Sequence, residues 1–325
     1  MAIRLTGVKT VAVLAAVFVC ALGLWLWRDP MGLISAEFAR QRWMAGLQAH
    51  EVTVAGHRIA YVERAAREPG AATVVMVHGF TGSKENWYPV AARLIGHYRV
   101  IALDLPGWGQ SQRLPGQDYG FDAQNRRLQA FLAAVQQPGS PIVLLGHSMG
   151  GGIVALTAAD RPELVARVGL IDAAGVHFHD NAFGEAVLAG KNPFAVSDEA
   201  SLQRYLDTVF FDRAQQPWIP WPARQALIDF RRQQAPFEQA VLDRIGRSPE
   251  RFLPGEAAAH IDQPALLLWC DQDRVIDPSA LDLYGARMPQ ALKVRLSQCG
   301  HMSIVERPDD VAAAIDTLIR RGVAR

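Results

Sequence analysis

The sequence around Ser148 carries the clearest chemical signal in the chain. Ser148 is the central residue of a G-x-S-x-G motif that runs from Gly146 to Gly150. The motif follows an apolar run at residues 142–145 and precedes a stretch of small residues, which is the pattern of a sharp turn from a strand into a helix. Glycine on both sides leaves room for the strained serine backbone, and the hydroxyl then projects above the sheet. This pattern predicts a serine nucleophile.

A serine hydroxyl needs a base to accept its proton, so a histidine and an orienting acid should follow in the order Ser, Asp or Glu, His. His301 follows the last predicted strand, and Asp273 follows the strand before it. Loops at the carboxyl ends of strands can converge on one site. We therefore expect Ser148, Asp273 and His301 to form a catalytic triad. The alternatives for the acid are Asp271, Asp277 and, more remotely, Asp172.

Acyl transfer also requires hydrogen-bond donors for the oxyanion of the tetrahedral intermediate. The strand predicted at residues 73–77 ends in His78-Gly79-Phe80. This order places the backbone N–H of Phe80 where an oxyanion hole needs it, with the N–H of Met149 as its partner. We expect neither a metal ion nor a cofactor, because this chemistry requires neither and the cysteines lack C-x-x-C spacing.

The rest of the sequence predicts the strands and helices that position these candidate site residues. Apolar runs bounded by Gly, Pro or Asp indicate strands, and helical stretches separate them. The predicted strands lie at residues 73–77, 99–103, 142–145, 165–171, 265–269 and 292–296, after a hairpin at 52–62. The expected fold is therefore α/β, with a mostly parallel eight-stranded sheet covered by helices on both faces.

The alternation of strands and helices stops between residues 175 and 256, a region rich in aromatic residues and proline. We expect a helical cap over the carboxyl edge of the sheet, where open α/β sheets bind ligands. The alternative is a small packed subdomain in which the aromatic side chains of this region form a core of their own. The expected domains are an anchor at 1–28, a juxtamembrane helix at 29–50, a core at 51–174 and 257–325, and a cap at 175–256.

Composition excludes several classes of protein. Half of the 325 residues are apolar, 20% are charged, and the formal net charge is +1. These values exclude a disordered chain, a collagen and a coiled coil. They also provide no broad basic surface for nucleic acid, so we expect no nucleic-acid partner.

The N-terminus carries a candidate membrane anchor. Residues 11–27 contain no charged side chain, and the run ends in Trp25 and Trp27, as at a membrane interface. A cleaved signal peptide is the alternative, but the run is long for one and no clean cleavage site follows. The next helix should continue to about Ala49. Ala12, Ala16 and Cys20 recur every four residues, so two anchors could pair as a homodimer.

The basic N-terminus favours an N-inside orientation, with the remainder of the chain outside the cytoplasm, although Arg28, Arg40 and Arg42 weaken the charge bias. In that compartment Cys270 and Cys299 could form a disulfide, because they follow neighbouring strands. We favour two buried thiols, since side chains at neighbouring strand positions often point apart.

These motifs together resemble the α/β-hydrolase superfamily over residues 50–322. The resemblance rests on the residues at 78–80, 104–111, 146–151, 271–273 and 300–302. Serine at position 148 disfavours the dehalogenases and epoxide hydrolases of the superfamily, which use a carboxylate nucleophile. Cys270 departs from the glycine that is common before the acid loop.

Within the superfamily, the anchor, the juxtamembrane stretch and the apolar cap are similar to monoacylglycerol lipases and to membrane-anchored bacterial phospholipases A. This resemblance implies hydrolysis of acyl esters in monoacylglycerols, lysophospholipids or phospholipids, at the bacterial inner membrane with a periplasmic catalytic domain. A carboxylesterase for small soluble esters is the main alternative. A non-catalytic membrane-tethered binding protein is a remote one, because no triad member is missing.

Overall fold

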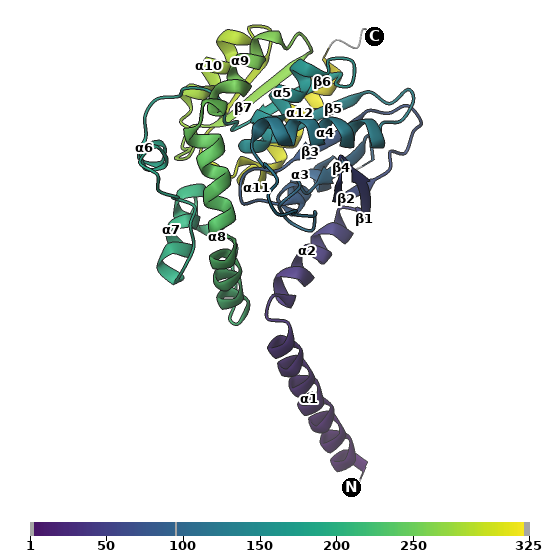
Figure 1. Cartoon of the computed structure of the whole chain (residues 1–325). Helices are drawn as coiled ribbons and strands as arrows, with labels where there is room; N and C mark the ends of the chain where they lie inside the picture. Colours follow the sequence, from purple (N-terminus) through teal and green to yellow (C-terminus); the bar gives the residue numbers. More distant parts are fainter. Residues whose placement is uncertain (1–2, 95, 322–325) are drawn as a thin grey trace.

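A computed structural model describes residues 3–94 and 96–321 of the chain. Its centre is the predicted eight-stranded sheet, in the order β1-β2-β4-β3-β5-β6-β7-β8 (Figure 1). β2 pairs antiparallel with β1 and β4, and the other pairs are parallel. The strands are β1 (Gln48–Val54), β2 (His57–Arg64), β3 (Thr73–Val77), β4 (Arg99–Leu103), β5 (Ile142–His147), β6 (Arg167–Ile171), β7 (Ala265–Cys270) and β8 (Leu292–Leu296).

The inner strands are mostly apolar because both faces of the sheet are covered. All residues of β3 are buried, and alternate side chains point to opposite faces. Val75 and Val77 therefore belong to one apolar core, and Val74 and Met76 belong to the other. This explains why continuous apolar runs, rather than alternating ones, predicted these strands.

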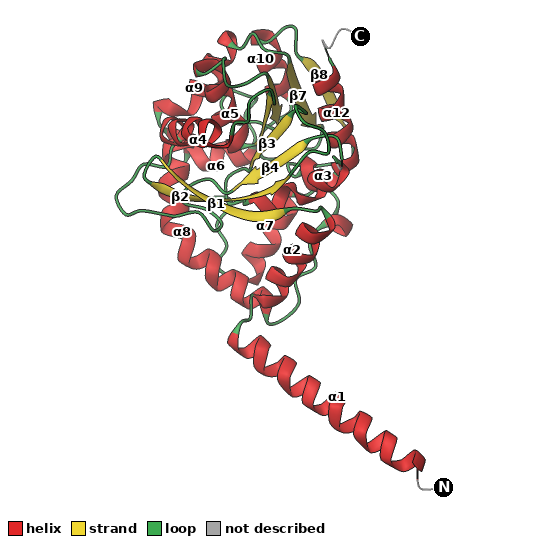
Figure 2. Ribbon diagram, turned by 90° about the vertical axis from the view of Figure 1, so that its right-hand side faces the viewer, coloured by secondary structure: helices red, strands yellow, loops and turns green. Residues whose placement is uncertain are grey.

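Two groups of helices cover the two faces (Figure 2). One group consists of α4 (Phe121–Val135), α5 (Met149–Asp160), α9 (Leu253–Ala257) and α10 (Ser279–Arg287). The other consists of α3 (Tyr88–Arg93), α11 (Ser303–Glu306) and α12 (Pro308–Arg320). Short 3-10 helices complete the chain at η1 (Lys84–Trp87), η2 (Arg213–Gln215), η3 (Pro249–Phe252) and η4 (Ala258–His260).

Residues 172–264, all of them described, contain helices and loops but no strand. This region includes α6 (Ala182–Leu188), α7 (Glu199–Val209) and α8 (Ala223–Arg247). α8 has 25 residues and is about 37 Å long. One of its ends lies beside α2, on the side of the molecule from which α1 projects (Figure 1).

The N-terminal helix α1 (Ile3–Arg28) stands apart from the body of the molecule (Figure 1). Within it, Thr10–Arg28 has a mean hydropathy of 2.3 and is not buried by the rest of the chain. This stretch is long and apolar enough to cross a membrane. The expected anchor also includes residues 1–2 and the expected core includes residues 322–325, which lie outside the described residues.

The connection from α1 to the sheet differs from the sequence-based expectation. α2 (Gly32–Met44) ends five residues before Ala49, and β1 begins at Gln48. Gly46 has a φ of +67°, a left-handed conformation that terminates helices and favours glycine. The early start of β1 follows from its pairing with β2, in which Gln48 lies opposite Glu63.

Cys270 and Cys299 form a disulfide, with their Cα atoms 5.4 Å apart. The preference for two free thiols was therefore wrong. Cys270 is the last residue of β7, but Cys299 lies in the loop three residues beyond β8. The alternation of side chains along paired strands does not apply to a loop residue, so the two sulfur atoms can meet.

Candidate active site

Ser148 lies at a tight turn between β5 and α5. Its backbone has φ 55° and ψ −122°, which is strained for a residue with a side chain. The flanking residues must be glycine, because neighbouring backbone segments leave no space for a side chain at these two positions. A Cβ atom on Gly146 would lie 2.3 Å from the carbonyl oxygen of Gly150, and one on Gly150 would lie 2.4 Å from the carbonyl oxygen of His78. The motif therefore holds the Ser148 side chain at the carboxyl edge of the sheet.

The structure brings Ser148, His301 and Asp273 together from three different loops. Nε2 of His301 is 2.9 Å from Oγ of Ser148, and Nδ1 is 2.8 Å from Oδ2 of Asp273. All three side chains are buried. The backbone N–H groups of Val275 and Ile276 donate to Oδ1 of Asp273. Each oxygen of the carboxylate therefore faces a donor, and the carboxylate fixes the imidazole as the Nδ1–H tautomer.

Burial determines the protonation state of the imidazole. It lowers the pKa of His301 to about 3, and the nearby carboxylate of Glu306 opposes this effect. Burial also raises the pKa of Asp273, while the N–H groups of Val275 and Ile276 oppose that change. His301 is consequently neutral at neutral pH, and its Nε2 is available to accept a proton from Ser148.

The alternative acids lie elsewhere. Asp271 forms an ion pair with Arg295, and Asp277 accepts a hydrogen bond from the backbone N–H of Ser279. Asp172 is buried and accepts from the hydroxyl of Ser303. Burial, and then the charge of Asp273, raises the pKa of Asp172. Among the described residues, Asp273 is the carboxylate that is hydrogen-bonded to His301.

Phe80 and Met149 flank the nucleophile from two sides. Met149 is the first residue of α5, whose N-terminal end favours negative charge. Phe80 follows Gly79, where a Cβ atom would lie 2.9 Å from Cβ of Ser148. The loop after β3 therefore packs directly against Ser148, and the side chains of Phe80 and Met149 line the same cavity as Ser148.

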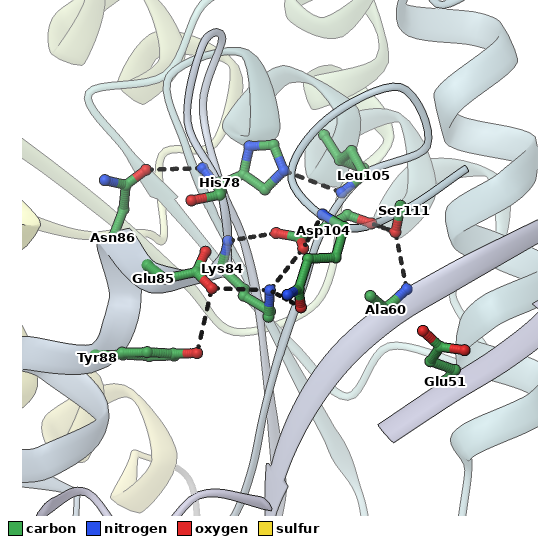
Figure 3. Close-up of polar contacts among 12 residues, drawn as sticks. Glu51, Ala60, His78, Lys84, Glu85, Asn86, Tyr88, Asp104, Leu105 and Ser111 are labelled. Atoms are coloured by element: carbon green, nitrogen blue, oxygen red, sulfur yellow. Dashed lines mark hydrogen bonds and ion pairs between the residues drawn. The ribbon is translucent and has the colours of Figure 1, made fainter. Parts of the chain in front are cut away.

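Sequence analysis missed the buried charges that support this loop (Figure 3). Nζ of Lys84 lies 2.7 Å from Oδ2 of Asp104 and 2.8 Å from Oε1 of Glu85. Burial lowers the pKa of Lys84, but the carboxylates of Asp104 and Glu85 raise it more, so the net shift is upward. His78 accepts from the backbone N–H of Leu105 (3.0 Å). Asp104 stood in a recognised motif, yet no sequence signal paired it with Lys84.

Glu306 is a second residue that sequence analysis missed. Its buried carboxylate accepts from the backbone N–H of Gly300 (2.7 Å), next to His301. It also accepts from the N–H groups of Phe211 and Asp212, in the loop that follows α7. One carboxylate therefore connects the loop of the catalytic histidine candidate to the cap.

Ser148 lies between two cavities. The larger has about 900 Å³ of empty space, part of it open to solvent, and extends between α6 and α8. Its lining is mostly apolar and includes Val187, Leu242, Ile245 and several aromatic rings. The smaller, of about 370 Å³, also contains His301 and is bordered by polar side chains that include Thr81, Asn86 and Tyr205. Such a division suits a substrate with one apolar arm and one polar arm.

Within residues 3–94 and 96–321, no group of three or more His, Cys, Asp or Glu side chains is arranged to hold a metal ion. The polar groups around Ser148 are instead hydrogen-bonded to one another, as in nucleophilic catalysis.

Comparisons with known proteins agree with this geometry. Residues 74–314 match the model of the alpha/beta hydrolase family. Monoacylglycerol lipase ABHD6 of Homo sapiens is 27% identical over 316 residues, which cover 94% of this chain and 91% of that protein. Lipase 1 of Psychrobacter immobilis is 29% identical over 278 residues, which cover 84% of each chain.

Solved structures give a similar result. The crystal structure of a membrane phospholipase A, described as a bacterial virulence factor, superposes with a TM-score of 0.84 and 32% identity. The match covers 97% of this chain and 99% of that chain, so it includes the N-terminal region. A crystal structure described as a putative lipase from Acinetobacter baumannii gives a TM-score of 0.76 with 26% identity, over 87% of this chain and 96% of that one.

Proposed function

Because this chain belongs to the alpha/beta hydrolase family, we propose that it is a membrane-anchored serine hydrolase that cleaves carboxylic esters of lipids through an acyl-enzyme. The substrates are acyl esters of monoacylglycerols, lysophospholipids or phospholipids. One observation carries this proposal: a large apolar cavity opens directly onto Ser148 and can hold a long acyl chain.

In the first half of the reaction, Oγ of Ser148 attacks the ester carbonyl carbon while Nε2 of His301 accepts the hydroxyl proton. The carbonyl π electrons move to its oxygen, and the N–H groups of Phe80 and Met149 stabilise the resulting oxyanion. When the tetrahedral intermediate collapses, the bond to the alcohol oxygen breaks. His301 returns its proton to that oxygen, and the acyl group remains on Ser148.

In the second half, His301 accepts a proton from a water molecule, whose oxygen attacks the acyl carbon. The intermediate collapses, Ser148 Oγ leaves with the proton from His301, and the fatty acid is released. The carboxylate of Asp273 accepts the hydrogen bond from Nδ1–H and stabilises the imidazolium that forms twice in the cycle.

The two cavities suggest how the substrate lies. The acyl chain occupies the larger cavity, where contact with Val187, Leu242 and Ile245 removes its apolar surface from water. The polar alcohol occupies the smaller cavity beside Thr81 and Tyr205. The relatives named above as a monoacylglycerol lipase, a lipase and a phospholipase A support a lipid substrate.

The proposed location is the bacterial inner membrane, with the catalytic domain in the periplasm. α1 is long enough to cross the bilayer, and the buried Cys270–Cys299 disulfide is favoured by an oxidising compartment. The small side chains of Ala12 and Ala16 would allow two copies of α1 to approach closely as a homodimer. Crosslinking of the full chain and of a form lacking residues 1–28 tests this pairing, and equal dimer fractions would exclude a role for α1.

Chain-length profiling tests the substrate class. We expect the rate on p-nitrophenyl esters to rise from acetate to medium and long acyl chains, and fatty acid to be released from monoacylglycerol, lysophospholipid or phospholipid in vesicles. The reason is that each methylene buried in the apolar cavity contributes about 0.8 kcal/mol. A maximum at acetate, with no release from any of the three lipids, would instead identify a carboxylesterase for small soluble esters.

A further inference from the structure

The most exposed aromatic side chains of the cap lie in the loop that precedes α8. Trp218 is 86% exposed and Trp221 is 82% exposed. They belong to residues 216–222, Gln-Pro-Trp-Ile-Pro-Trp-Pro, which contain no charged residue. We call this segment the cap tip. Full exposure of two indole rings to water is unfavourable, so the cap tip requires an apolar partner.

The position of the cap tip identifies that partner. In Figures 1 and 2 the start of α8 lies at the end of the body nearest to α1, beside α2. α2 and α8 are also in contact in the structure. The body-proximal end of α1 carries two tryptophans of its own, Trp25 and Trp27, the second of which is 77% exposed. The cap tip and the end of the membrane-spanning candidate are therefore on the same side of the molecule.

The backbone of the cap tip suits the interfacial region of a bilayer. Pro217, Pro220 and Pro222 have no N–H group, so three of its seven residues have no donor to leave unsatisfied away from water. Tryptophan is enriched at this depth, because its ring is apolar and its indole N–H still reaches water. The composition is that of a segment which lies in the interface without crossing the membrane.

The charged side chains near the cap tip along the chain are paired within the protein. The nearest arginines along the chain are Arg213 and Arg224, and each forms an ion pair, with Asp207 and Glu199 respectively. The main force at the cap tip is therefore the burial of the indole rings. Attraction to anionic headgroups contributes less. A contact of this kind depends weakly on salt and does not require anionic lipid.

We propose that the cap tip inserts into the interfacial region of the same bilayer that holds α1, as a second membrane contact. The proposal rests on the membrane attachment proposed above. A protein held by one helix can rotate about it, whereas two contacts fix its orientation. α8 connects the cap tip to the wall of the apolar cavity, where Leu242 and Ile245 lie, so the second contact also orients the cavity relative to the lipid surface.

Nitroxide accessibility in proteoliposomes of zwitterionic lipid tests the proposal with the full chain. The label is attached in three chains: at native Cys20, at position 218 in Cys20→Ser/Trp218→Cys, and at position 282 in Cys20→Ser/Asp282→Cys. Cys20 is exposed and unbridged, and Asp282 is an exposed residue of α10, at the end of the body away from α1 (Figure 1). We expect high oxygen and low water-soluble nickel accessibility at positions 20 and 218, and the reverse at position 282.

The outcomes separate this inference from the proposed function. A water-accessible label at position 20 would contradict the membrane anchor itself. A membrane-buried label at position 20 with a water-accessible label at position 218 would overturn only the cap-tip contact. Spin–spin broadening at position 218 that disappears on dilution with unlabelled protein would also overturn it, because a second copy of the chain would then cover the cap tip.

A kinetic comparison provides a second, independent test. We expect Trp218→Ala/Trp221→Ala to lower fatty-acid release from vesicles about tenfold, while hydrolysis of a soluble short-chain ester stays unchanged. Trp43→Ala is the matched control, because Trp43 is 80% exposed but lies at the β1 end of α2. Equal vesicle rates for the wild type and the double variant would contradict the proposal, and equal soluble-ester rates would show that the fold is intact.

Discussion

At the residue scale, the loop that carries Phe80 is followed by a buried charge pair, Lys84 and Asp104. Lys84 and Asp104 are almost completely buried, and Asp104 also accepts from the backbone N–H groups of Lys84 and Gln110. Removing one partner of a buried pair leaves an uncompensated charge, which costs more than the pair contributes. This cluster therefore keeps the loop after β3 against Ser148.

We expect Asp104→Asn to lower the free energy of unfolding by about 3 kcal/mol, because the Lys84 ammonium loses its main counterion. We also expect kcat to fall more than KM changes, since the loop positions Phe80. Denaturant unfolding in detergent micelles and steady-state kinetics measure the two effects. Glu51→Gln is the control: it removes an exposed ion pair with Arg58 and should cost less than about 1 kcal/mol. Equal stability of both variants would show that the buried cluster has no special role.

His147 makes stability depend on pH. Burial, and then repulsion from the His301 ring when that ring is protonated, lowers the pKa of His147 to about 3. Its Nε2 donates to the carbonyl oxygen of His301 (2.7 Å). With its pKa lowered to about 3, the ring is neutral in the folded state at neutral pH. The unfolded ring binds a proton near pH 6.5, whereas the folded ring does so only near pH 3. The contribution of the neutral ring is complete above pH 6.5 and decreases as the pH falls towards 3.

A His147→Gln variant isolates this effect, because glutamine does not titrate. We expect the free energy of unfolding of the wild type to decrease relative to the variant below pH 6.5, by up to about 1.4 kcal/mol per pH unit. Denaturant unfolding from pH 8 to pH 4.5 measures the difference. A difference that is independent of pH would mean that His147 is already accessible to protons in the folded protein.

At the element scale, the disulfide joins the two loops that carry Asp273 and His301. It closes a loop over a sequence separation of 29 residues. We expect Cys270→Ala/Cys299→Ala to lower the free energy of unfolding by about 3 kcal/mol through the entropy of the unfolded chain. We also expect a lower kcat, because the distance from Asp273 to His301 is less constrained. Thermal unfolding measures the loss of stability, and steady-state kinetics measures the change in kcat. The control variant Cys20→Ser should change neither the melting temperature nor kcat. An unchanged melting temperature in Cys270→Ala/Cys299→Ala would contradict the stabilising role of the disulfide.

The elements also show what sequence could predict. The strands were predictable because β3 to β7 are buried on both faces and read as continuous apolar runs. The loops that carry Ser148 and Asp273 were predictable because each directly follows such a run. His301 follows the partly exposed strand β8 instead, and its position after Ser148 and Asp273 in the chain is what indicated it. The pairing of Lys84 with Asp104 was not, because the two residues are 20 positions apart and meet only through the parallel pairing of β3 with β4. The start of β1 at Gln48 was not predictable either, because it depends on pairing with Glu63 of β2.

At the scale of the whole molecule, the candidate anchor and the candidate active site are formed by different parts of the chain. α1 projects from one side, while Ser148 lies at the carboxyl edge of the sheet, under α6, α7 and α8. Sequence could predict the apolar N-terminal helix, because a long apolar run is a local property. It could not predict that the loop before α8 lies on the same side as α1, since this arrangement depends on how the cap folds over the sheet.

The proposed mechanism requires that one residue, Ser148, is the nucleophile of lipid ester hydrolysis. The most direct measurement compares the full-length wild type with Ser148→Ala in vesicles, by fatty-acid release from a monoacyl lipid and by labelling with a fluorophosphonate probe. We predict that the wild type is labelled at Ser148 and that the variant is unlabelled, with kcat/KM lower by about 10⁴-fold. Fatty-acid release by Ser148→Ala at a rate near that of the wild type, or labelling of this variant by the probe, would contradict the account.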